Sequence, residues 1–286
     1  MTATARLISG NRLHLQHGPI DLIIGADGAR EQIELAYRAA CNAFPEILPV
    51  LVAELSLLRA PIHRTSGDAM YGGGTVASRM LSAVWPYRDR FITPMAAVAG
   101  SVADEMLAIM CRRAALDRAY VNNGGDVAIQ LSGTAAFTAG IVGDLAAPGI
   151  DTRIVIRAND NIGGIATSGW RGRSLSLGIA DAVTILARTA AEADAAATMI
   201  ANAVDVDDPV IQRQPAQAVR DDSDLGDLLV TVEVGRLSPE QRTRAISRGV
   251  TRAREILSHN LIVAAYIQLQ GEMVVVGGHM LAARAA

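Results

Sequence analysis

The stretch YVNNGGDVAIQL, residues 120–131, decides how this chain can fold. Apolar and β-branched residues at both ends indicate β-strand, whereas the centre holds two amides, two glycines and one carboxylate: Asn122, Asn123, Gly124, Gly125 and Asp126. Glycines let the backbone turn sharply and expose its N–H groups, and a carboxylate just after them can bind a cation, a sugar hydroxyl or a heterocyclic N–H. A tight turn between two strands, capped by the aspartate, explains the same pattern equally well.

Further strand-like runs follow this stretch and precede it. The runs TAAFTAGIV, TRIVIRA, GGIATSG and ADAVTILAR come after it, short pieces fill residues 4–24, and LLVTVEV, LIVAAYIQL and EMVVVGG lie near the end. Helical spacing of apolar residues covers 75–86, 95–115, 189–204 and a segment that begins at Ser238, a favourable N-cap. Strands in consecutive runs, with helices in separate blocks, predict an α+β fold with mostly antiparallel sheets flanked by helices.

Two segments are expected to depart from regular structure. Helical spacing over Ala29–Leu58 contains Pro45 and Pro49, which we expect to break that stretch in two. Residues 205–227 are polar and acidic, and they are expected to form a surface excursion.

Composition excludes several function classes. The chain has 286 residues, half of them hydrophobic but only 3% aromatic, so the core must be aliphatic. Its net charge of −3 is well mixed, so neither nucleic acid nor an anionic membrane is an expected partner. There is no lysine, which excludes a Schiff-base lysine and a Walker-type phosphate loop. Arg-biased codon usage explains the missing lysines, and the exclusions hold whatever the cause.

The two cysteines and the apolar runs indicate the compartment. Cys41 and Cys111 are far apart in apolar helical patterns, so they are expected to be reduced core residues. No signal-peptide pattern is present and no run is expected to reach transmembrane length. We therefore expect a soluble, cytoplasmic protein.

Several residues outside the glycine stretch could carry chemistry. Asp194 and Thr198 are four residues apart, so a helix would place both hard oxygen ligands on one face, where Mg²⁺ or Ca²⁺ could bind. A solvated polar face explains that pair as well. Ser168, Gly169, Arg171 and Arg173 in IATSGWRGRS could receive a phosphate or carboxylate, or form an exposed turn. Weaker candidates are the helix start after Gly72–Gly74, the HxxH pair His14 and His17, and His63.

Two alanine-rich segments echo each other. AVAGSVADEMLAIM and AEADAAATMIANAV are both small-residue helices that carry an Ala-Asp pair. A duplicated half and convergent alanine-rich helices both explain the echo.

Taken in order along the chain, these pieces resemble the ApbE superfamily of flavin transferases. AAVAGSVADE, VNNGGDVAI, GIATSG and ADAAAT match its motifs in order and spacing, over a core region at about 94–204. The resemblance implies an ApbE-like, T-fold-related architecture in two interlocked halves, with 1–286 as one domain and, together with the apolar composition, a homodimer. It implies Mg²⁺ held by Asp194, Thr198 and the backbone carbonyl of Ala99, with FAD or FMN as the ligand. The resemblance thus assigns two catalytic carboxylates, Asp126 and Asp194, and ligand contacts by Asn122, Asn123, Gly124, Gly125, Thr167, Ser168, Gly169, Arg171 and Arg173.

The departures from the family limit what the resemblance implies. Flavin transferases carry a His and a Pro-x-Thr-Gly turn after the ATSG strand, where this chain has RSLSLGIADAVT. That segment, HGPIDLII and FITPMAAVAGSVADE instead resemble an uncharacterised ApbE-like side branch. Three hypotheses remain open: an ApbE-like enzyme acting on a small anionic or heterocyclic ligand, a degenerate flavin- or nucleotide-binding protein, and a divergent FAD:protein FMN transferase.

Overall fold

The computed structural model describes residues 2–64, 73–141, 152–172 and 174–278. The chain forms two compact units, each assembled from segments that are not contiguous in sequence. The first unit comprises residues 1–137, 156–166 and 187–195, and the second comprises 138–155, 167–186 and 196–286.

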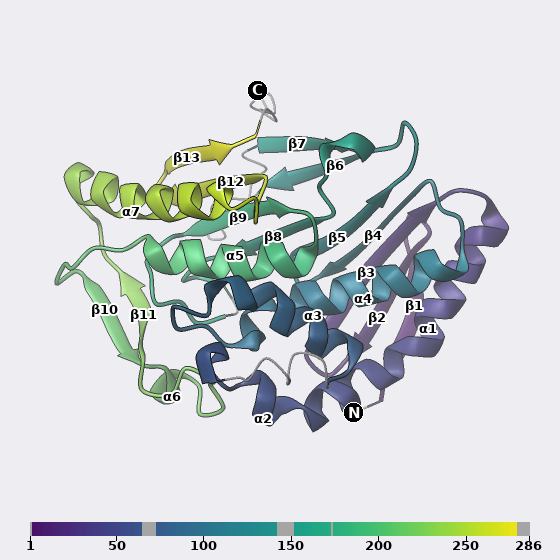
Figure 1. Cartoon of the computed structure of the whole chain (residues 1–286), viewed down its shortest axis with the longest axis horizontal. Helices are drawn as coiled ribbons and strands as arrows, with labels where there is room; N and C mark the ends of the chain where they lie inside the picture. Colours follow the sequence, from purple (N-terminus) through teal and green to yellow (C-terminus); the bar gives the residue numbers. More distant parts are fainter. Residues whose placement is uncertain (1, 65–72, 142–151, 173, 279–286) are drawn as a thin grey trace. The chain divides into compact units, whose positions relative to one another are not determined.

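The first unit is an antiparallel sheet with helices on one face. Its strands lie in the order β1-β2-β3-β4-β5-β8, with the bounds β1 Thr4–Ile8, β2 Arg12–His17, β3 Ile20–Asp27, β4 Arg118–Asn123, β5 Asp126–Leu131 and β8 Gly164–Ser168. The helices are α1 Arg30–Ala53, α2 Leu55–Leu58, α3 Thr75–Val84 and α4 Val98–Arg113, with short 3-10 turns at Ile62–Arg64, Trp85–Tyr87 and Pro94–Ala97. Figure 1 shows α1 and α4 lying across the strands, with α1 against β2 and α4 against β4 and β5.

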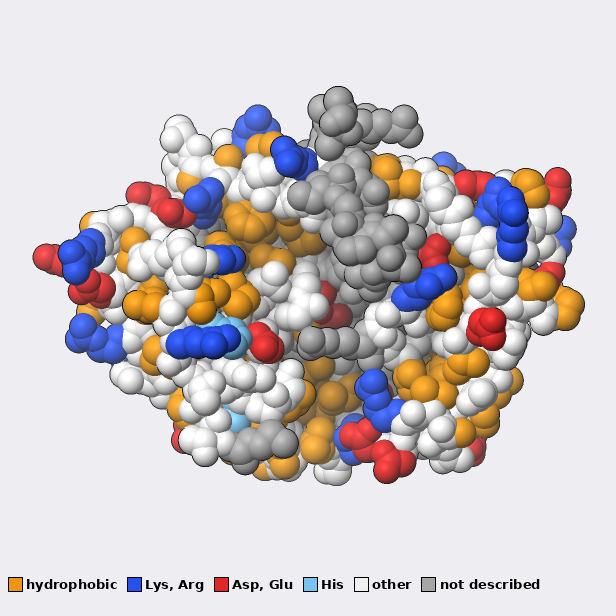
Figure 2. Space-filling view, turned by 180° about the vertical axis from the view of Figure 1, so that it is seen from behind, with side chains coloured by type: hydrophobic (Ala, Val, Ile, Leu, Met, Phe, Trp, Pro, Cys, Tyr) orange, Lys and Arg blue, Asp and Glu red, His pale blue; other side chains and the backbone are white. Residues whose placement is uncertain are grey.

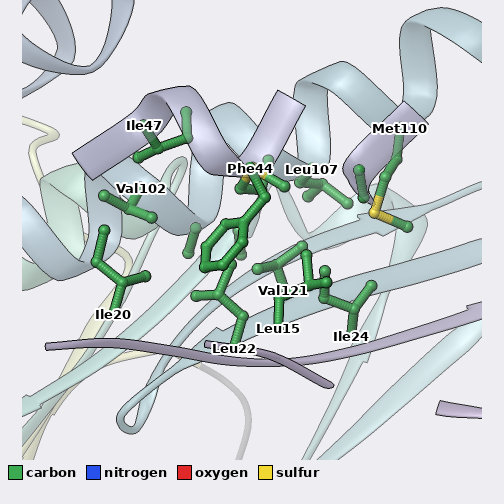
Figure 3. Packing of buried hydrophobic residues seen from close by; sticks show 14 of the residues in the cluster. Leu15, Ile20, Leu22, Ile24, Phe44, Ile47, Val102, Leu107, Met110 and Val121 are labelled. Carbon is green, nitrogen blue, oxygen red and sulfur yellow. The ribbon is translucent and has the colours of Figure 1, made fainter. Parts of the chain in front are cut away.

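Period-two burial explains why these strands face the helices as they do. In β2, Leu13 and Leu15 are buried with the helices, and in β3 Leu22 and Ile24 are buried beside them. Figure 3 shows the ring of Phe44 reaching from α1 toward Leu15 and Leu22, with Val102 and Leu107 of α4 nearby. The core of this unit is mainly aliphatic, as the composition predicts, with Phe44 and Tyr37 as its aromatic members.

The expected break at Pro45 and Pro49 is wrong, because α1 continues through both prolines to Ala53. Both prolines are exposed, so the carbonyl groups that lose an N–H partner can bind water. The buried stripe of Phe44, Ile47 and Leu51 keeps the helix packed on the sheet. Tertiary packing therefore outweighs the helix-breaking tendency of proline here.

One apolar helical run is long enough to cross a membrane, although none was expected to be. Pro94–Arg113 is long and apolar enough to cross a membrane by length and composition, but 61% of that window is buried inside the protein. It also carries Asp104 and Glu105, both buried in α4. These features are typical of a core helix, and the run is weak support for a membrane span.

The second unit also consists of antiparallel strands and helices. Its sheet has the order β9-β12-β13, and β10 pairs with β11 as a separate ribbon. The bounds are β9 Ala182–Ala187, β10 Ile211–Pro215, α6 Ala216–Val219, β11 Leu229–Val234, α7 Pro239–Ser258, β12 Ala264–Leu269 and β13 Glu272–Gly277. A ribbon of β6 Ala136–Ile141 and β7 Thr152–Arg157, and helix α5 Ala190–Ala203, are divided between the units.

Local sequence signals set the boundaries of the second unit with one exception. Ser238 caps α7 as predicted, in a capping box with Gln241. Residues 205–227, expected as a polar excursion, contain β10, which pairs antiparallel with β11. β10 is short and mostly polar, so hydrophobic alternation does not predict it. Its backbone hydrogen bonds to β11 stabilise it as a strand. These strand pairs are antiparallel, and helices flank them, so the predicted α+β fold class is confirmed.

Charges are distributed as the composition predicts. Figure 2 shows Arg, Asp and Glu side chains interspersed over the face it displays, rather than gathered into one patch of a single sign. Cys41 and Cys111 are free thiols that are only partly buried, and burial raises the pKa of both.

Phe44→Ala should test the packing of the first unit. The Phe44 side chain is 1% exposed, so its truncation should lower the free energy of unfolding by about 3–5 kcal/mol. Leu35→Ala on the same helix is the matched control, because Leu35 is 42% exposed and should cost less than about 1 kcal/mol. Chemical denaturation of both variants measures the difference; equal losses would contradict this description of the core.

Candidate functional site

The glycine stretch forms a two-residue hairpin between β4 and β5. Asn123 pairs with Asp126 across the hairpin, which leaves Gly124 and Gly125 as the loop. Their φ angles are +66° and +119°, which L-residues rarely adopt, so the glycines are required by the turn. The Asn122 side-chain Oδ1 accepts a hydrogen bond of 2.9 Å from the Gly125 N–H. The turn interpretation is therefore correct, and Asn122 serves to close it.

Asn123 joins this hairpin to the start of α4. Its side chain is 8% exposed, and its Nδ2 donates a hydrogen bond of 3.1 Å to the carbonyl oxygen of Ala99. The neighbouring Gly124 and Gly125 are exposed, and Asp126 is partly buried. The hairpin thus holds the Asp126 carboxylate at a fixed place beside the N-terminus of α4.

Asp194 approaches the same helix end from α5. Its Oδ2 accepts a hydrogen bond of 3.0 Å from the Gly100 N–H, in the first turn of α4. Burial and the nearby charge of Asp126 raise the pKa of Asp194 well above its ordinary value. Hydrogen bonds from the backbone N–H groups of Gly100 and Ala99 lower this pKa, but their effect is smaller. Asp194 as a whole residue is partly exposed. Asp126, Asp194 and the Ala99 carbonyl are therefore brought together within the first unit.

A second aspartate, which the sequence did not single out, mirrors Asp194. Asp104 of α4 accepts hydrogen bonds of 3.0 Å and 2.9 Å from the N–H groups of Ala190 and Ala191, the first residues of α5. Its side chain is 9% exposed, and burial raises the pKa of Asp104 to about 6 even though these two N–H groups lower it. Each helix therefore supplies a carboxylate to the N-terminus of the other. The signal in the sequence was the echo of two Ala-Asp helices.

Close backbone packing makes this exchange of caps feasible. A Cβ added at Gly100 would lie 2.2 Å from the carbonyl oxygen of Ala190, so only glycine permits the approach. The first α5 residues are alanines with almost no exposed surface. Glycine at residue 100 is therefore required by the distance between the two backbones at this point.

The ligand contacts predicted at the end of β8, from Thr167 onward, lie in the second unit. Arg171 lies 3.5 Å from the carboxylate of Asp181 and stacks 4.5 Å from the ring centroid of Trp170. A Cβ at Gly169 would meet the Asp181 carbonyl oxygen at 2.3 Å, and Thr167 forms a hydroxyl pair with Thr184 at 2.8 Å. Thr167 and Arg171 thus have partners within the chain, and Ser168 is partly exposed. Arg173 lies outside the described residues.

The weaker candidates are placed apart from this arrangement. Gly72 lies outside the described residues, and the Gly74 N–H at the start of α3 binds Glu54 at 2.6 Å, which leaves the helix end capped. His14 bonds Asp21 at 2.9 Å and accepts from Arg6, whereas the ring of His17 meets Phe44 edge-on, so the two histidines face opposite sides of the sheet. His63, Arg88 and Arg90 are exposed.

A metal ion would need backbone and hydroxyl ligands in addition to carboxylates. Among the described residues there is no group of three or more His, Cys, Asp or Glu side chains suited to hold a metal ion. Thr198 lies on α5 one turn after Asp194 and is also partly exposed. The donor set of the Asp194 carboxylate, the Ala99 carbonyl and the Thr198 hydroxyl is hard oxygen, which Mg²⁺ prefers.

The family comparison is decisive at this point. Over residues 4–275 the chain matches the family described as AbpE bacteria. The chain belongs to this family. The ApbE-like resemblance of its motifs is thereby confirmed, and the match extends beyond the predicted motif region to both units.

Curated relatives of this AbpE-bacteria chain are UPF0280 proteins of archaea. That of Methanopyrus kandleri is 36% identical over 165 residues, 58% of this chain and 64% of the relative. That of Methanothrix thermoacetophila is 38% identical over 117 residues, 41% of this chain and 48% of the relative. The chain thus spans about half to two thirds of the length of these relatives.

Solved structures similar to the chain are far more distant in sequence. An ApbE protein of Thermotoga maritima has a TM-score of 0.48 at 12% identity, covering 97% of this chain and 96% of its own. The apo flavinyl transferase ApbE of Pseudomonas stutzeri has a TM-score of 0.40 at 11% identity, covering 98% and 96%. TM-scores below 0.5 do not by themselves establish a shared fold, so no residue role follows from either.

The pH dependence of stability tests the burial of Asp104. Its pKa of about 6 in the folded protein lies above the value of 3.8 expected when unfolded, so the protonated carboxyl favours the fold. This contribution is present at low pH and is lost as pH rises from about 4 to about 6. From pH 5 to pH 7 the wild type should lose about 1 kcal/mol of unfolding free energy relative to Asp104→Asn.

Urea denaturation at several pH values measures this difference, and the exposed residue Asp89 provides the control variant Asp89→Asn. The control should follow the wild type at every pH. Parallel curves for wild type and Asp104→Asn would show that Asp104 is not buried as described.

Proposed function

We propose that this AbpE-bacteria protein is an ApbE-like enzyme that binds a small anionic or heterocyclic ligand, a flavin nucleotide, together with Mg²⁺. The observation that carries the proposal is the carboxylate of Asp194, a partly exposed residue, beside Asp126 and the Ala99 carbonyl. Family membership supports flavin as the ligand class, and the ApbE protein of Pseudomonas stutzeri is described as a flavinyl transferase.

The charge balance around Asp194 favours a cation. Glu105 of α4, also buried, forms ion pairs with two arginines, Arg79 at 3.0 Å and Arg112 at 3.1 Å. Among the described residues Asp194 has no such ion pair, and Asp126 and Asp104 both raise its pKa. A divalent cation would replace the missing positive charge and stabilise the ionised carboxylate.

The chain's own residues would divide the work in this site. Asp194, the Ala99 carbonyl and Thr198 would hold Mg²⁺, and Asn123 would keep the Ala99 carbonyl in place. Bound Mg²⁺ would supply Lewis-acid stabilisation of phosphate oxygens. Asp126 would orient the ligand or accept a proton from it, and Gly124 would offer its backbone N–H group. Contacts from Thr167, Ser168, Gly169, Arg171 and Arg173 remain predictions for ligand binding.

A binding protein without catalysis is the second candidate. The segment that replaces the transferase His and Pro-x-Thr-Gly turn contains Asp181, whose carboxylate accepts from the Trp170 indole at 3.2 Å and from the Gln270 N–H at 2.5 Å. The Asp181 carboxylate is thus occupied by hydrogen bonds within the second unit. This favours a protein that has lost the transfer reaction. We further propose a cytoplasmic homodimer that binds neither nucleic acid nor membrane, supported by the mixed surface charge.

Titration with FAD and Mg²⁺ tests the proposed function. Wild type should bind FAD in a Mg²⁺-dependent way, and Asp194→Ala should weaken this binding by at least about tenfold because it removes the carboxylate ligand. Asp89→Ala, which removes an exposed carboxylate elsewhere, should leave binding unchanged.

The fate of the flavin separates the candidates. Release of AMP from FAD over hours supports a divergent flavin transferase, conversion to another product supports a different ApbE-like enzyme, and FAD that stays bound and unconsumed supports the binding protein. Absence of any flavin binding, or equal binding by wild type and Asp194→Ala, would contradict the proposal.

A further inference from the structure

The exchange of caps between α4 and α5 gives Asp104 a role that its burial alone does not explain. Both oxygens of Asp104 are used, Oδ1 by Ala190 N–H and Oδ2 by Ala191 N–H, at 3.0 Å and 2.9 Å. These bonds fix the first turn of α5, and Asp194 follows within the next turn of the same helix. The position of the Asp194 carboxylate is therefore set through Asp104.

A second hydrogen bond runs in the opposite direction, from α4 to the carboxylate on α5. Asp194 Oδ2 accepts from Gly100 N–H in the first turn of α4, the helix that carries Asp104. The α4 N-cap, Ala97, makes no side-chain cap bond. At the start of α5, Thr189 Oγ1 accepts from the Glu192 N–H at 3.1 Å, but among the described residues only Asp104 is found bonded to the Ala190 and Ala191 N–H groups. Loss of either carboxylate would thus release N–H groups in one helix and shift the acid carried by the other.

Gly164 restricts the start of α5 from a third side. A Cβ at Gly164 of β8 would lie 2.2 Å from the backbone nitrogen of Ala190, so the strand backbone touches the helix end that Asp104 caps. With the Ala190 carbonyl against Gly100 on the other side, that helix end is held between α4 and β8. A small rotation of α5 would therefore meet backbone atoms rather than flexible side chains.

We propose that Asp104 is a positioning residue for the site, which aligns the Asp194 carboxylate for cation binding by capping the N-terminus of α5. This inference rests on the proposed function for the identity of Asp194 as a cation ligand. Asp104 does not touch the cation; it acts through Ala190, Ala191 and the first turns of α5.

The test compares Asp104→Ala, Asp104→Asn and a matched cap variant, Glu54→Ala. Glu54 caps α3 through Gly74 N–H in the same unit, so its loss should lower stability without touching α5. Mn²⁺ serves as the probe, with affinity measured by electron paramagnetic resonance on the folded full chain. In parallel, NMR follows the carboxyl resonance of Asp194 with pH and the exchange protection of the Ala190 and Ala191 amides.

A positioning role predicts a graded result. Asp104→Ala should bind Mn²⁺ about tenfold to a hundredfold more weakly than wild type, in line with other residues that orient metal ligands. Asp104→Asn removes the same charge but keeps one acceptor oxygen, so it should recover a large part of that affinity. Glu54→Ala should bind as wild type does. Amide protection should fall at both Ala190 and Ala191 in Asp104→Ala, at one of the two in Asp104→Asn, and at neither in Glu54→Ala.

Other outcomes overturn one claim or the other. Equal weakening in Asp104→Ala and Asp104→Asn would assign Asp104 a purely electrostatic role, and unchanged affinity would leave it as a structural cap only; both refute positioning. If wild type binds no Mn²⁺ at Asp194, the proposed function fails, and the amide exchange measurement still decides the inference. In that case, amide protection at Ala190 and Ala191 that falls equally in Asp104→Ala and Asp104→Asn, or in neither, refutes positioning.

Discussion

The structure depends on a reciprocal contact between two helix N-termini. The first N–H groups of a helix have no partner within it, and here α4 and α5 satisfy them with Asp194 and Asp104 from each other. The contact requires glycine at residue 100, because the Ala190 carbonyl leaves no room for a Cβ. Ala190 and Ala191, the first residues of α5, are buried at this contact, where larger side chains would have to displace their neighbours.

This arrangement concentrates negative charge at two helix N-termini, and the charge of Arg79 also lowers the pKa of Asp104. Each carboxylate gains the N-terminal end of a helix dipole, but Asp126 adds a third acid next to Asp194. Burial raises the pKa of both Asp104 and Asp194, so the fold keeps two acids in places that disfavour their charged forms. Unfavourable acids held in place by packing are typical of functional sites, which is why the site is assigned here rather than at the arginine-paired Glu105.

Sequence patterns predicted the framework well because local physics controls it. The hairpin at Gly124 and Gly125 follows from a conformation that only glycine adopts easily, and the Ser238 cap marks the start of α7. Tertiary packing decided the rest: α1 runs through two exposed prolines, and β10 forms only because β11 lies beside it. These outcomes depend on neighbours distant in sequence, which local patterns do not encode.

The candidate site was predicted in part for the same reason. Motif order selected Asp126 and Asp194 as candidates, and the structure brings the two carboxylates near each other. Motif order could not show that the side chains of Asn122 and Asn123 bond backbone groups, or that Arg171 is paired with Asp181. Asp104 was hidden because its partners are backbone N–H groups 86 and 87 residues away. The most direct test of the whole account is anomalous diffraction from crystals soaked in Mn²⁺. The account predicts a peak within bonding distance of both the Asp194 carboxylate and the Ala99 carbonyl oxygen; ordered α4 and α5 with no peak there would contradict it.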